Sequence, residues 1–245
     1  MVLPLFHHQL EPIPSIGQAI TLDGTEGKHA VSVRRMRVGE GIQLSNGLGA
    51  RVLGQVAEIG ANQLVITVAE VLVEEPPAPG IALVQALAKG DRDEMAVQGG
   101  TELGISTVIP WQADRSVSRW EGPKVAKGVA RWQVIANEAS KQALRSINPV
   151  VEEPVSTKQL AGRLNNFALV LVLDPTAEHR ISEIKLPETG QIAVVVGPEG
   201  GIDESELAIL SDAGAVRVRL GESILRTSTA GLAAIAVLEA RLGRW

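Results

Sequence analysis

Apolar and polar residues follow two different patterns along the 245 residues of the chain. In residues 1–72, short segments of alternating or β-branched residues are separated by turn signals such as Asn46-Gly47. This pattern predicts short strands that form a small β-barrel. We expect strands at 18–22, 41–44, 50–58 and 63–71, and a short helix at 29–36.

The pattern changes after a linker at residues 73–80. Three prolines and a glycine fall within Glu74-Glu-Pro-Pro-Ala-Pro-Gly80, a composition that interrupts regular structure. From residue 81 onward, apolar strands alternate with helical segments. Strands are expected at 81–88, 107–111, 169–173, 192–196 and 216–220, and helices near 92–103, 123–144 and 224–242. Because near-continuous apolar strands need cover on both faces, residues 81–245 predict a parallel α/β sheet between helices.

Composition excludes several kinds of chemistry. The chain has no cysteine, which removes disulfides, thiolate nucleophiles and cysteine-bound zinc, and its four histidines lack metal-ligand spacing. The longest apolar run near the C-terminus, at 231–238, is too short to cross a bilayer, and the N-terminus lacks the features of a signal peptide. We therefore expect a soluble, cytoplasmic protein without a metal.

Basic residues gather in two regions although the net charge is −5. Residues 28–37 contain four basic and no acidic residues, and residues 115–145 contain seven basic and two acidic ones. Both regions can contact phosphates, or the arginines can simply solvate helix faces. The residues that we assign to RNA binding are Lys28, Arg34, Arg35, Arg37, Arg115, Arg131 and Arg145. Arg131 and Arg145 belong to one row of an amphipathic helix, which can equally contact a second subunit.

A glycine-rich segment follows one of the predicted strands. Gly197-Pro-Glu-Gly-Gly201 comes directly after the strand at 192–196 and before Asp203, where acidic residues open a helix. Ligands of open α/β sheets bind at the carboxyl ends of the strands, and glycine lets the backbone approach them closely. Neither a P-loop nor a dinucleotide fingerprint is present, and the acids would repel phosphate. The segment therefore favours a neutral or cationic ligand, with a tight structural turn as the alternative.

Two further strand ends carry similar signals. In the segment from Leu220 to Gly231, Ser223 is expected to cap the last helix and Arg226 to lie in its first turn. Arginine is unfavourable at the positive end of a helix dipole unless it serves a ligand or partner, although a surface role stays open. The third strand end is Leu171-Val-Leu-Asp-Pro175. We expect the three loops to form one cofactor pocket.

In this order and spacing, the motifs resemble those of the bacterial small-subunit ribosomal RNA uracil-N3 methyltransferases of the SPOUT superfamily. The motifs are Lys28-His-Ala-x-x-Val-Arg-Arg-x-Arg-x-Gly39, Thr101-Glu-Leu-Gly104, Arg115-Ser116, Arg131-Trp132, Glu138-Ala139, Gln142, Arg145, Pro149, Val196-Gly-Pro-Glu-Gly-Gly201, Leu220-Gly221 and Ile224-Leu-Arg-Thr227. The resemblance covers essentially the whole chain. It departs from the family pattern at Leu5 and Gly99, where basic residues are usual, and at Ser228, which is often acidic.

The resemblance implies a PUA-like RNA-binding barrel at 1–72 and a SPOUT methyltransferase domain with a trefoil knot at 81–245. It also implies a homodimer that uses S-adenosylmethionine to methylate ring nitrogen 3 of a uridine in 16S rRNA of the 30S subunit. The implied cofactor residues are Leu173, Gly197, Pro198, Glu199, Gly200, Gly201, Leu220, Gly221, Ile224 and Leu225.

Two residues are candidates for catalysis. Arg226 is expected to stabilise the uracil anion that forms when the ring nitrogen loses its proton. Glu199 is either a base or a residue that holds the loop. Three alternatives stay open: a ribose 2′-O methyltransferase of the same superfamily, a ribosome assembly factor without catalytic activity, and an enzyme with another nucleotide cofactor.

Overall fold

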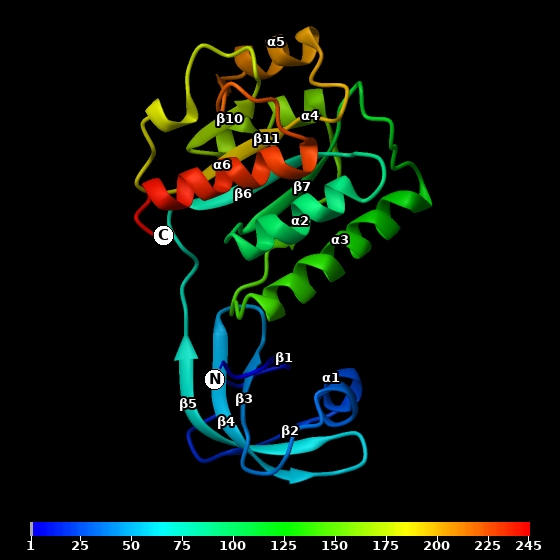
Figure 1. The fold of residues 1–245 in the computed structure, drawn as a ribbon, viewed down its shortest axis with the longest axis vertical. Helices are drawn as coiled ribbons and strands as arrows, with labels where there is room; N and C mark the ends of the chain where they lie inside the picture. The colour runs from blue at the N-terminus through cyan, green and yellow to red at the C-terminus, as the bar shows by residue number, and fades with distance from the viewer. Residues whose placement is uncertain (1) are drawn as a thin grey trace. The chain divides into compact units, whose positions relative to one another are not determined.

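The computed structural model describes residues 2–245, which divide into two compact units (Figure 1). One unit comprises residues up to 76 together with 140–148, and the other comprises residues 77–139 and 149–245. In the part of the chain that the structure describes, no helix is both long enough and apolar enough to cross a membrane.

The first unit contains one five-stranded sheet. Its strands are β1 (Leu5–His7), β2 (Ala19–Leu22), β3 (Gly41–Ser45), β4 (Ala50–Ile59) and β5 (Leu64–Val73). They pair in the order β1-β3-β4-β5-β2; β1 runs parallel to β3, and the other pairs are antiparallel. Two register shifts between β4 and β5, at Leu53/Gly54 and Val56/Glu58, let these long strands bend around a core of apolar side chains.

The predicted helix at 29–36 lies earlier in the chain. The structure has α1 (Gly24–Lys28), followed by a π-helical turn at His29–Val33. A Cβ atom on Gly27 would lie 2.5 Å from the carbonyl oxygen of Leu22, so α1 packs close to the end of β2 because residue 27 has no side chain. Arg35 then takes a φ of 52°, which ends helical geometry.

Residues 140–148 have their contacts within the first unit. Ser45 donates a 3.2 Å hydrogen bond to the carbonyl of Ser146, whose hydroxyl donates to Glu74 at 2.5 Å. The ammonium of Lys141 lies 2.8 Å from Glu26 on α1. No periodicity in the sequence indicated that this distant segment completes the unit.

The second unit is built on a parallel sheet. Its strands are β6 (Gly80–Ala86), β7 (Thr107–Gln112), β8 (Val150–Val151), β9 (Val155–Ser156), β10 (Leu169–Leu173), β11 (Gln191–Val196) and β12 (Val216–Val218). The order is β12-β10-β11-β6-β7-β8, and β9 also pairs with β7. All recorded pairs are parallel, which confirms the predicted parallel α/β sheet.

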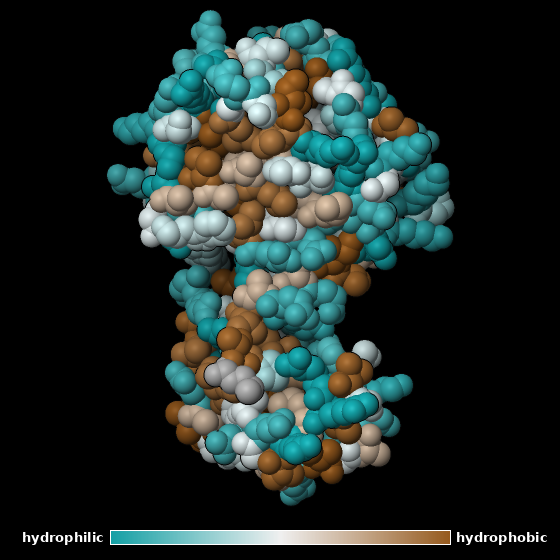
Figure 2. Space-filling model, viewed as in Figure 1, coloured by the Kyte–Doolittle hydropathy of each residue, from teal (hydrophilic) through white to brown (hydrophobic). Residues whose placement is uncertain are grey.

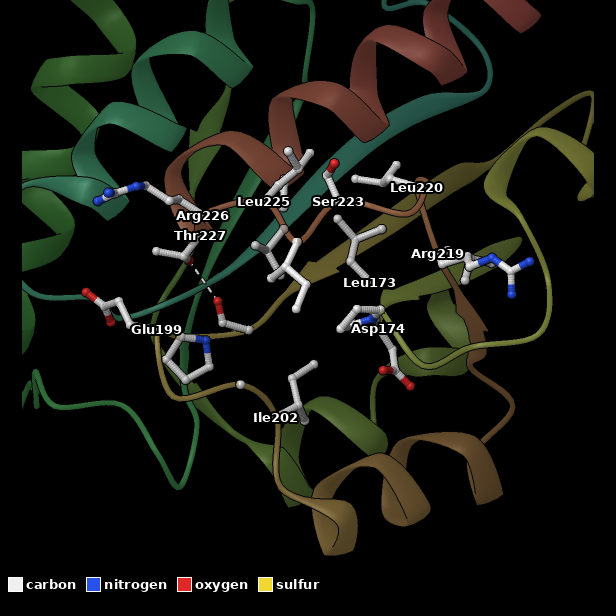
Figure 3. Close-up of a pocket in the computed structure, with 18 of the residues that line it drawn as sticks. Leu173, Asp174, Glu199, Ile202, Arg219, Leu220, Ser223, Leu225, Arg226 and Thr227 are labelled. Carbon is white, nitrogen blue, oxygen red and sulfur yellow. Dashed lines mark hydrogen bonds between the residues drawn. The ribbon is translucent and has the colours of Figure 1, made fainter.

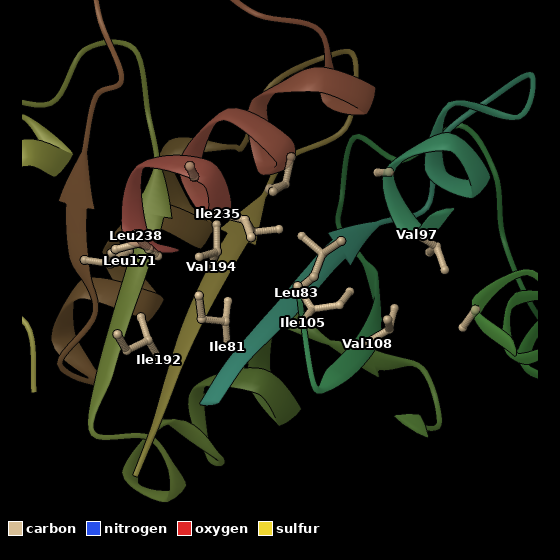
Figure 4. Packing of buried hydrophobic residues seen from close by; sticks show 14 of the residues in the cluster. Ile81, Leu83, Val97, Ile105, Val108, Leu171, Ile192, Val194, Ile235 and Leu238 are labelled. Atoms are coloured by element: carbon tan, nitrogen blue, oxygen red, sulfur yellow. The ribbon is translucent and has the colours of Figure 1, made fainter. Parts of the chain in front are cut away.

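Helices cover both faces of this sheet. They are α2 (Arg92–Glu102), α3 (Pro123–Gln142), α4 (Thr157–Ala161), α5 (Glu204–Asp212) and α6 (Thr227–Arg241), with 3₁₀ turns at Leu164–Asn166 and Ile181–Glu183. Side chains of α2, α3 and α6 share one buried cluster, and those of α4 and α5 share the other. Along β6, Leu83 faces the first cluster and Val84 the second, as the two-residue repeat of a strand requires (Figure 4).

Close packing between α2 and α6 explains one departure from the family pattern. A Cβ atom on Gly99 of α2 would lie 2.8 Å from a methyl carbon of Leu232 on α6. A lysine at this position would therefore force the two helices apart unless Leu232 moved. The other two departures, Leu5 and Ser228, are also buried here, at 7% exposure each.

Three of the four tryptophan residues pack in the core of the second unit. Trp111 and Trp132 are almost completely buried, and Trp120 packs edge-on against Trp132 at a ring-centroid distance of 5.0 Å. The indole nitrogen of Trp111 donates a 3.1 Å hydrogen bond to Thr157. These residues stabilise the helical layers on the two sides of the sheet.

Candidate functional site

A cavity of about 360 Å³ lies at the carboxyl ends of β10, β11 and β12 in the second unit (Figure 3). The loops that follow these three strands form its walls, and the first residues of α6 close one side. The structure thus brings together the three strand ends that the sequence singled out. This is the edge at which open α/β sheets bind ligands.

Most of the residues expected to bind a cofactor line this cavity. They are Leu173, Gly197, Pro198, Glu199, Gly201, Leu220, Gly221, Ile224 and Leu225. Gly200 is the exception. A Cβ atom placed on it would lie 3.3 Å from Cβ of Arg115, so this position faces the loop after β7. A larger residue at 200 would therefore press on Arg115 instead of filling the cavity.

Several further residues, which no sequence motif had marked as cofactor ligands, also line the cavity. These are Arg92, Asp174, Pro175, Val196, Ile202, Leu207, Val218, Arg219, Ser223, Thr227 and Ala230. Asp174 and Pro175 stood in the third strand-end motif, which was the available signal for them. Arg92 comes from the start of α2, more than 80 residues away in sequence from the other lining residues, and no local pattern places it here.

The glycine-rich turn is held at three points by other parts of the second unit. The hydroxyl of Thr227 donates a 2.7 Å hydrogen bond to the carbonyl oxygen of Gly197. Arg115 donates to the carbonyl of Gly200 at 3.2 Å and pairs with Asp203 at 2.7 Å. Glu199 forms the third connection. A turn that is fixed in this way presents its main-chain groups to a ligand without reorganisation.

Glu199 joins the turn to the segment before α2. Its Oε1 atom accepts hydrogen bonds from the backbone N–H of Lys89 at 3.0 Å and from Nη1 of Arg92 at 3.1 Å. Partial burial raises the pKa of Glu199, but these hydrogen bonds and the Arg92 charge outweigh it and leave the pKa below its ordinary value. A carboxylate with a lowered pKa and an occupied oxygen is a poor proton acceptor. The contacts favour the loop-holding role of Glu199 over the role of a base.

The last helix begins later than the sequence indicated. It starts at Thr227, so Arg226 is the N-cap residue with an extended backbone, and the expectation that Ser223 caps the helix and that Arg226 lies in its first turn is wrong. The start of α6 is instead fixed by the hydrogen bond that the Thr227 hydroxyl donates to the carbonyl of Gly197 in the glycine-rich turn. Arg226 remains exposed, and no ion pair to it occurs within residues 2–245.

Arg226 lies on the rim of the cavity, at the opposite end from Asp174 and Arg219 (Figure 3). Its guanidinium is therefore a free cation beside an enclosed apolar space. Such a group can stabilise negative charge that develops on a bound molecule.

The opposite wall carries a carboxylate that takes part in an ion pair. Asp174, of which only 6% is exposed, accepts a 2.6 Å hydrogen bond from Nε of Arg217 and further hydrogen bonds from Thr176. Burial raises the pKa of Asp174. The hydrogen bonds from Thr176 and Arg217 and the Arg217 charge lower it by more, so the pKa lies below its ordinary value. The carboxylate is ionised at neutral pH and is paired with Arg217, and Arg219 adds a cation to the same wall.

The residues assigned to RNA binding divide between the two units. Lys28, Arg34, Arg35 and Arg37 lie in the first unit, where their side chains are exposed. Within residues 2–245, none of these four forms an ion pair. Arg145 also belongs to the first unit.

The other two basic residues contact acids of the second unit. Arg131 forms two hydrogen bonds to the carboxylate of Glu94, at 2.7 and 3.0 Å. Arg115 pairs with Asp203 at the glycine-rich turn. Among residues 2–245, no three or more histidine, aspartate or glutamate side chains are placed to share a metal ion.

Comparison with known proteins identifies the family. A family model described as an RNA methyltransferase domain matches residues 74–239, and one described as an RNA methyltransferase PUA domain matches residues 22–69. The ribosomal RNA small subunit methyltransferase E of Mycobacterium bovis is 40% identical to this chain over 249 residues, which cover 100% of this chain and 94% of the relative. The Bacillus subtilis protein of the same name is 32% identical, with coverage of 96% and 94%.

A solved structure agrees with the sequence relatives. The crystal structure of a ribosomal RNA small subunit methyltransferase E from Neisseria gonorrhoeae, bound to S-adenosyl methionine, superposes with a TM-score of 0.86 at 28% identity. The match covers 98% of each chain. The chain therefore belongs to the RNA methyltransferase family that includes the ribosomal RNA small subunit methyltransferases E.

Proposed function

We propose that this protein transfers a methyl group from S-adenosylmethionine to ring nitrogen 3 of a uridine in 16S rRNA of the small ribosomal subunit. The observation that carries this proposal is the cavity formed by three strand-end loops in a chain of this family. Its relatives from Mycobacterium bovis and Bacillus subtilis are named as small-subunit rRNA methyltransferases. The nitrogen target follows from the family resemblance of the motifs.

The cavity has the size and chemistry for this cofactor. Its volume of about 360 Å³ lies within the range of pockets that enclose small ligands. Leu173, Leu220 and Leu225 offer an apolar surface, while main-chain groups of the glycine-rich turn are available for polar contacts. When bound, S-adenosylmethionine supplies an electrophilic methyl group on a cationic sulfur.

The reaction requires the uracil ring to become a better nucleophile. Its ring nitrogen 3 is protonated at neutral pH, so the proton must leave before or while the nitrogen–methyl bond forms. Negative charge then spreads over the two ring oxygens. Arg226 provides a cation at the cavity rim, where the ring must enter, and it stabilises this charge. We assign the proton to a base other than Glu199, because its Oε1 atom already accepts from Lys89 and Arg92.

The first unit would hold the RNA. A family model for RNA methyltransferase PUA domains matches residues 22–69, and the exposed cations from Lys28 to Arg37 lie within that range. Exposed, unpaired cations release counterions when they meet phosphates, which favours binding. The target base must leave its stack to reach an enclosed cavity.

We also propose that the protein acts in the cytoplasm as a homodimer. Figure 2 shows apolar side chains gathered over α6 and the loop before it. Ile224 is 82% exposed, and the outward row Thr229, Ala233, Ala236 and Ala240 on α6 consists of small, mostly apolar side chains. A helix that is apolar on nearly all sides is usually buried. A second copy of the chain would cover this surface beside the cavity.

Methylation of 30S subunits tests the proposed function. Unmodified subunits are incubated with the protein and S-adenosylmethionine labelled in the methyl group, and the RNA is digested to nucleosides for mass spectrometry. We expect N3-methyluridine at one site. Ribose-methylated nucleosides would instead indicate the 2′-O activity. If the protein binds the subunits but transfers no methyl group to their RNA, it is an assembly factor.

A further inference from the structure

One buried polar side chain does not fit the apolar strand that carries it. All seven residues of β6 are buried, and Gln85 is the single residue among them with a polar side chain. Its exposed fraction is 0%, and it lies beside Val196 at the end of β11. A buried amide costs free energy unless its groups are hydrogen-bonded, and an apolar residue would suit this position better for packing alone. Gln85 therefore has a role other than packing.

Gln85 begins a chain of hydrogen bonds that ends in the glycine-rich turn. Its Nε2 atom donates to Thr227 Oγ1 at 2.9 Å and to the carbonyl of Ala86 at 3.1 Å. Thr227 Oγ1 in turn donates to the carbonyl of Gly197 at 2.7 Å (Figure 3). The chain connects three segments: strand β6, the start of α6 and the turn after β11.

The direction of this chain is fixed by its chemistry. A threonine hydroxyl has one proton, and a carbonyl oxygen can only accept, so the proton of Thr227 goes to Gly197. The Gln85 atom that faces Thr227 must then be a donor, which is the amide nitrogen. The carbonyl of Ala86, a second acceptor beside the same nitrogen, requires the same orientation. A glutamate at position 85 could not make these two bonds as a carboxylate.

Thr227 and Gly197 both line the cavity, whereas Gln85 stands behind them. Gly197 cannot be held by a side chain of its own, because a Cβ atom there would lie 2.6 Å from a side-chain carbon of Ile202. The position of its carbonyl depends on Thr227, and the hydroxyl of Thr227 is oriented by Gln85. One amide behind the cavity thus sets the relative position of two of its walls.

We propose that Gln85 and Thr227 are positioning residues that hold the glycine-rich turn and the start of α6 in the conformation that binds S-adenosylmethionine. This inference rests on the proposed function, because it assumes that cofactor. The Oε1 atom of Gln85 is buried without a hydrogen-bond partner, which costs free energy of folding. This cost supports the positioning role, because the protein keeps the amide for the two hydrogen bonds that Nε2 donates.

Calorimetry with S-adenosylmethionine on the full-length protein tests the proposal. Thr227→Val preserves shape and removes the hydroxyl, while Thr227→Ser preserves the hydroxyl. We expect Thr227→Val to bind the cofactor about tenfold or more weakly and Thr227→Ser to stay within about threefold of the wild type. Thr101→Val is the matched control, because it removes another buried hydroxyl, which donates to the carbonyl of Val97 and does not line the cavity. It should lower the melting temperature without changing cofactor affinity.

Gln85→Met separates positioning from stability. Methionine fills the space with apolar atoms, so the unliganded protein should melt no lower than the wild type while its cofactor affinity falls. Because the two residues act in one chain, the double variant Gln85→Met/Thr227→Val should bind no more weakly than Thr227→Val alone. In steady-state methylation, KM for the cofactor should rise while kcat at saturation changes little.

Three outcomes overturn the proposal, and they show whether the proposed function fails with it. If the wild type binds S-adenosylmethionine and Thr227→Val binds it equally well, or if the two substitutions act additively, the positioning role is wrong and the proposed function stands. If the wild type itself does not bind S-adenosylmethionine, both fail.

Discussion

Glu199 and Arg92 form a 3.1 Å ion pair across the rim of the cavity, and the backbone N–H of Lys89 donates to the same carboxylate oxygen. The pair joins the glycine-rich turn to the first residue of α2, which is remote in sequence. It leaves the Glu199 oxygen engaged, and this arrangement has consequences for both catalysis and pH dependence.

Glu199→Gln should change cofactor affinity by no more than about tenfold and leave kcat close to that of the wild type. An amide can still accept from Lys89, whereas loss of a general base typically costs about 10²–10⁴-fold in rate. Arg92→Gln should reproduce the affinity change, and the double variant should not exceed either single one. A collapse of turnover in Glu199→Gln alone would restore Glu199 as the base.

The same ion pair should make cofactor binding sensitive to acid. The pKa of Glu199 is lowered in the folded protein, so Glu199 stays charged and its ion pair with Arg92 stays formed until the pH falls below the ordinary carboxyl range. Affinity should therefore be constant from neutral pH down to about pH 4, the usual region for a glutamate, and decline below it. In Glu199→Gln, the decline due to this group should be absent. Calorimetry between pH 3.5 and 7 follows it, with each variant checked for folding.

Arg226→Ala should reduce turnover by about 10²–10³-fold with little loss of cofactor affinity, by analogy with removal of an oxyanion-hole donor. Uracil is neutral before reaction and gains negative charge only as its proton leaves, so the cation acts mainly on the transition state. Arg226→Lys should recover part of the rate, since a point charge lacks the planar guanidinium. Lys185→Ala removes another exposed cation of the same unit and should leave single-turnover methylation unchanged. Near-normal turnover in Arg226→Ala would mean that the anion is stabilised elsewhere.

Neutralising Arg34, Arg35 and Arg37 together should weaken RNA binding and flatten its dependence on salt. Each phosphate contact that is lost lowers the slope of log affinity against log salt by roughly 0.7–0.9. Cofactor affinity should not change, because these residues lie in the first unit and the cavity lies in the second. Lys158→Gln/Lys185→Gln serves as the control on the second unit. An unaltered salt slope in the triple variant would assign the basic segment to solvated surface.

Ala236→Glu should convert the proposed dimer to a monomer. Ala236 lies on the outward face of α6, where a carboxylate would be buried without a partner if a second copy covers the helix. Light scattering should give a mass near twice 25.9 kDa for the wild type and near 25.9 kDa for the variant. Ala130→Glu, an exposed alanine of α3, should remain dimeric. A wild-type monomer with full activity would contradict the homodimer.

Lys141→Met should destabilise the first unit by on the order of 3 kcal/mol, because it leaves Glu26 unpaired in a half-buried site. Only 6% of the Lys141 side chain is exposed. Adding Glu26→Leu should recover much of the loss, since two apolar side chains need no partner. Urea unfolding measures both changes. If the double variant is no more stable than the single one, the loss comes from packing and not from the unpaired charge.

Local patterns were sufficient for five of the seven strands of the second unit, whereas the two-residue strands β8 and β9 were not predicted. The predicted strand at 169–173 coincides with β10, and 192–196 differs from β11 by one residue. Their runs of branched apolar residues point to both faces of the sheet, so they are buried only if helices cover both faces. The beginning of α6 was predicted less well because Ser223 is a good cap by type, yet the hydrogen bond from Thr227 to Gly197 decides where the helix starts. The trefoil knot follows from the family resemblance and stays a prediction.

Local sequence patterns were enough to predict the parallel sheet, the glycine-rich turn at a strand end and the basic segment, because each depends on neighbours within a few residues. Tertiary structure alone decided that Arg92 reaches the cavity, that Gly200 faces Arg115 and that residues 140–148 join the first unit. It also placed Gln85 behind Thr227 across 142 residues of sequence. These relationships arise because packing brings distant segments within a few ångströms, and hydrogen bonds then select the partners, a process that leaves no periodic signal along the chain.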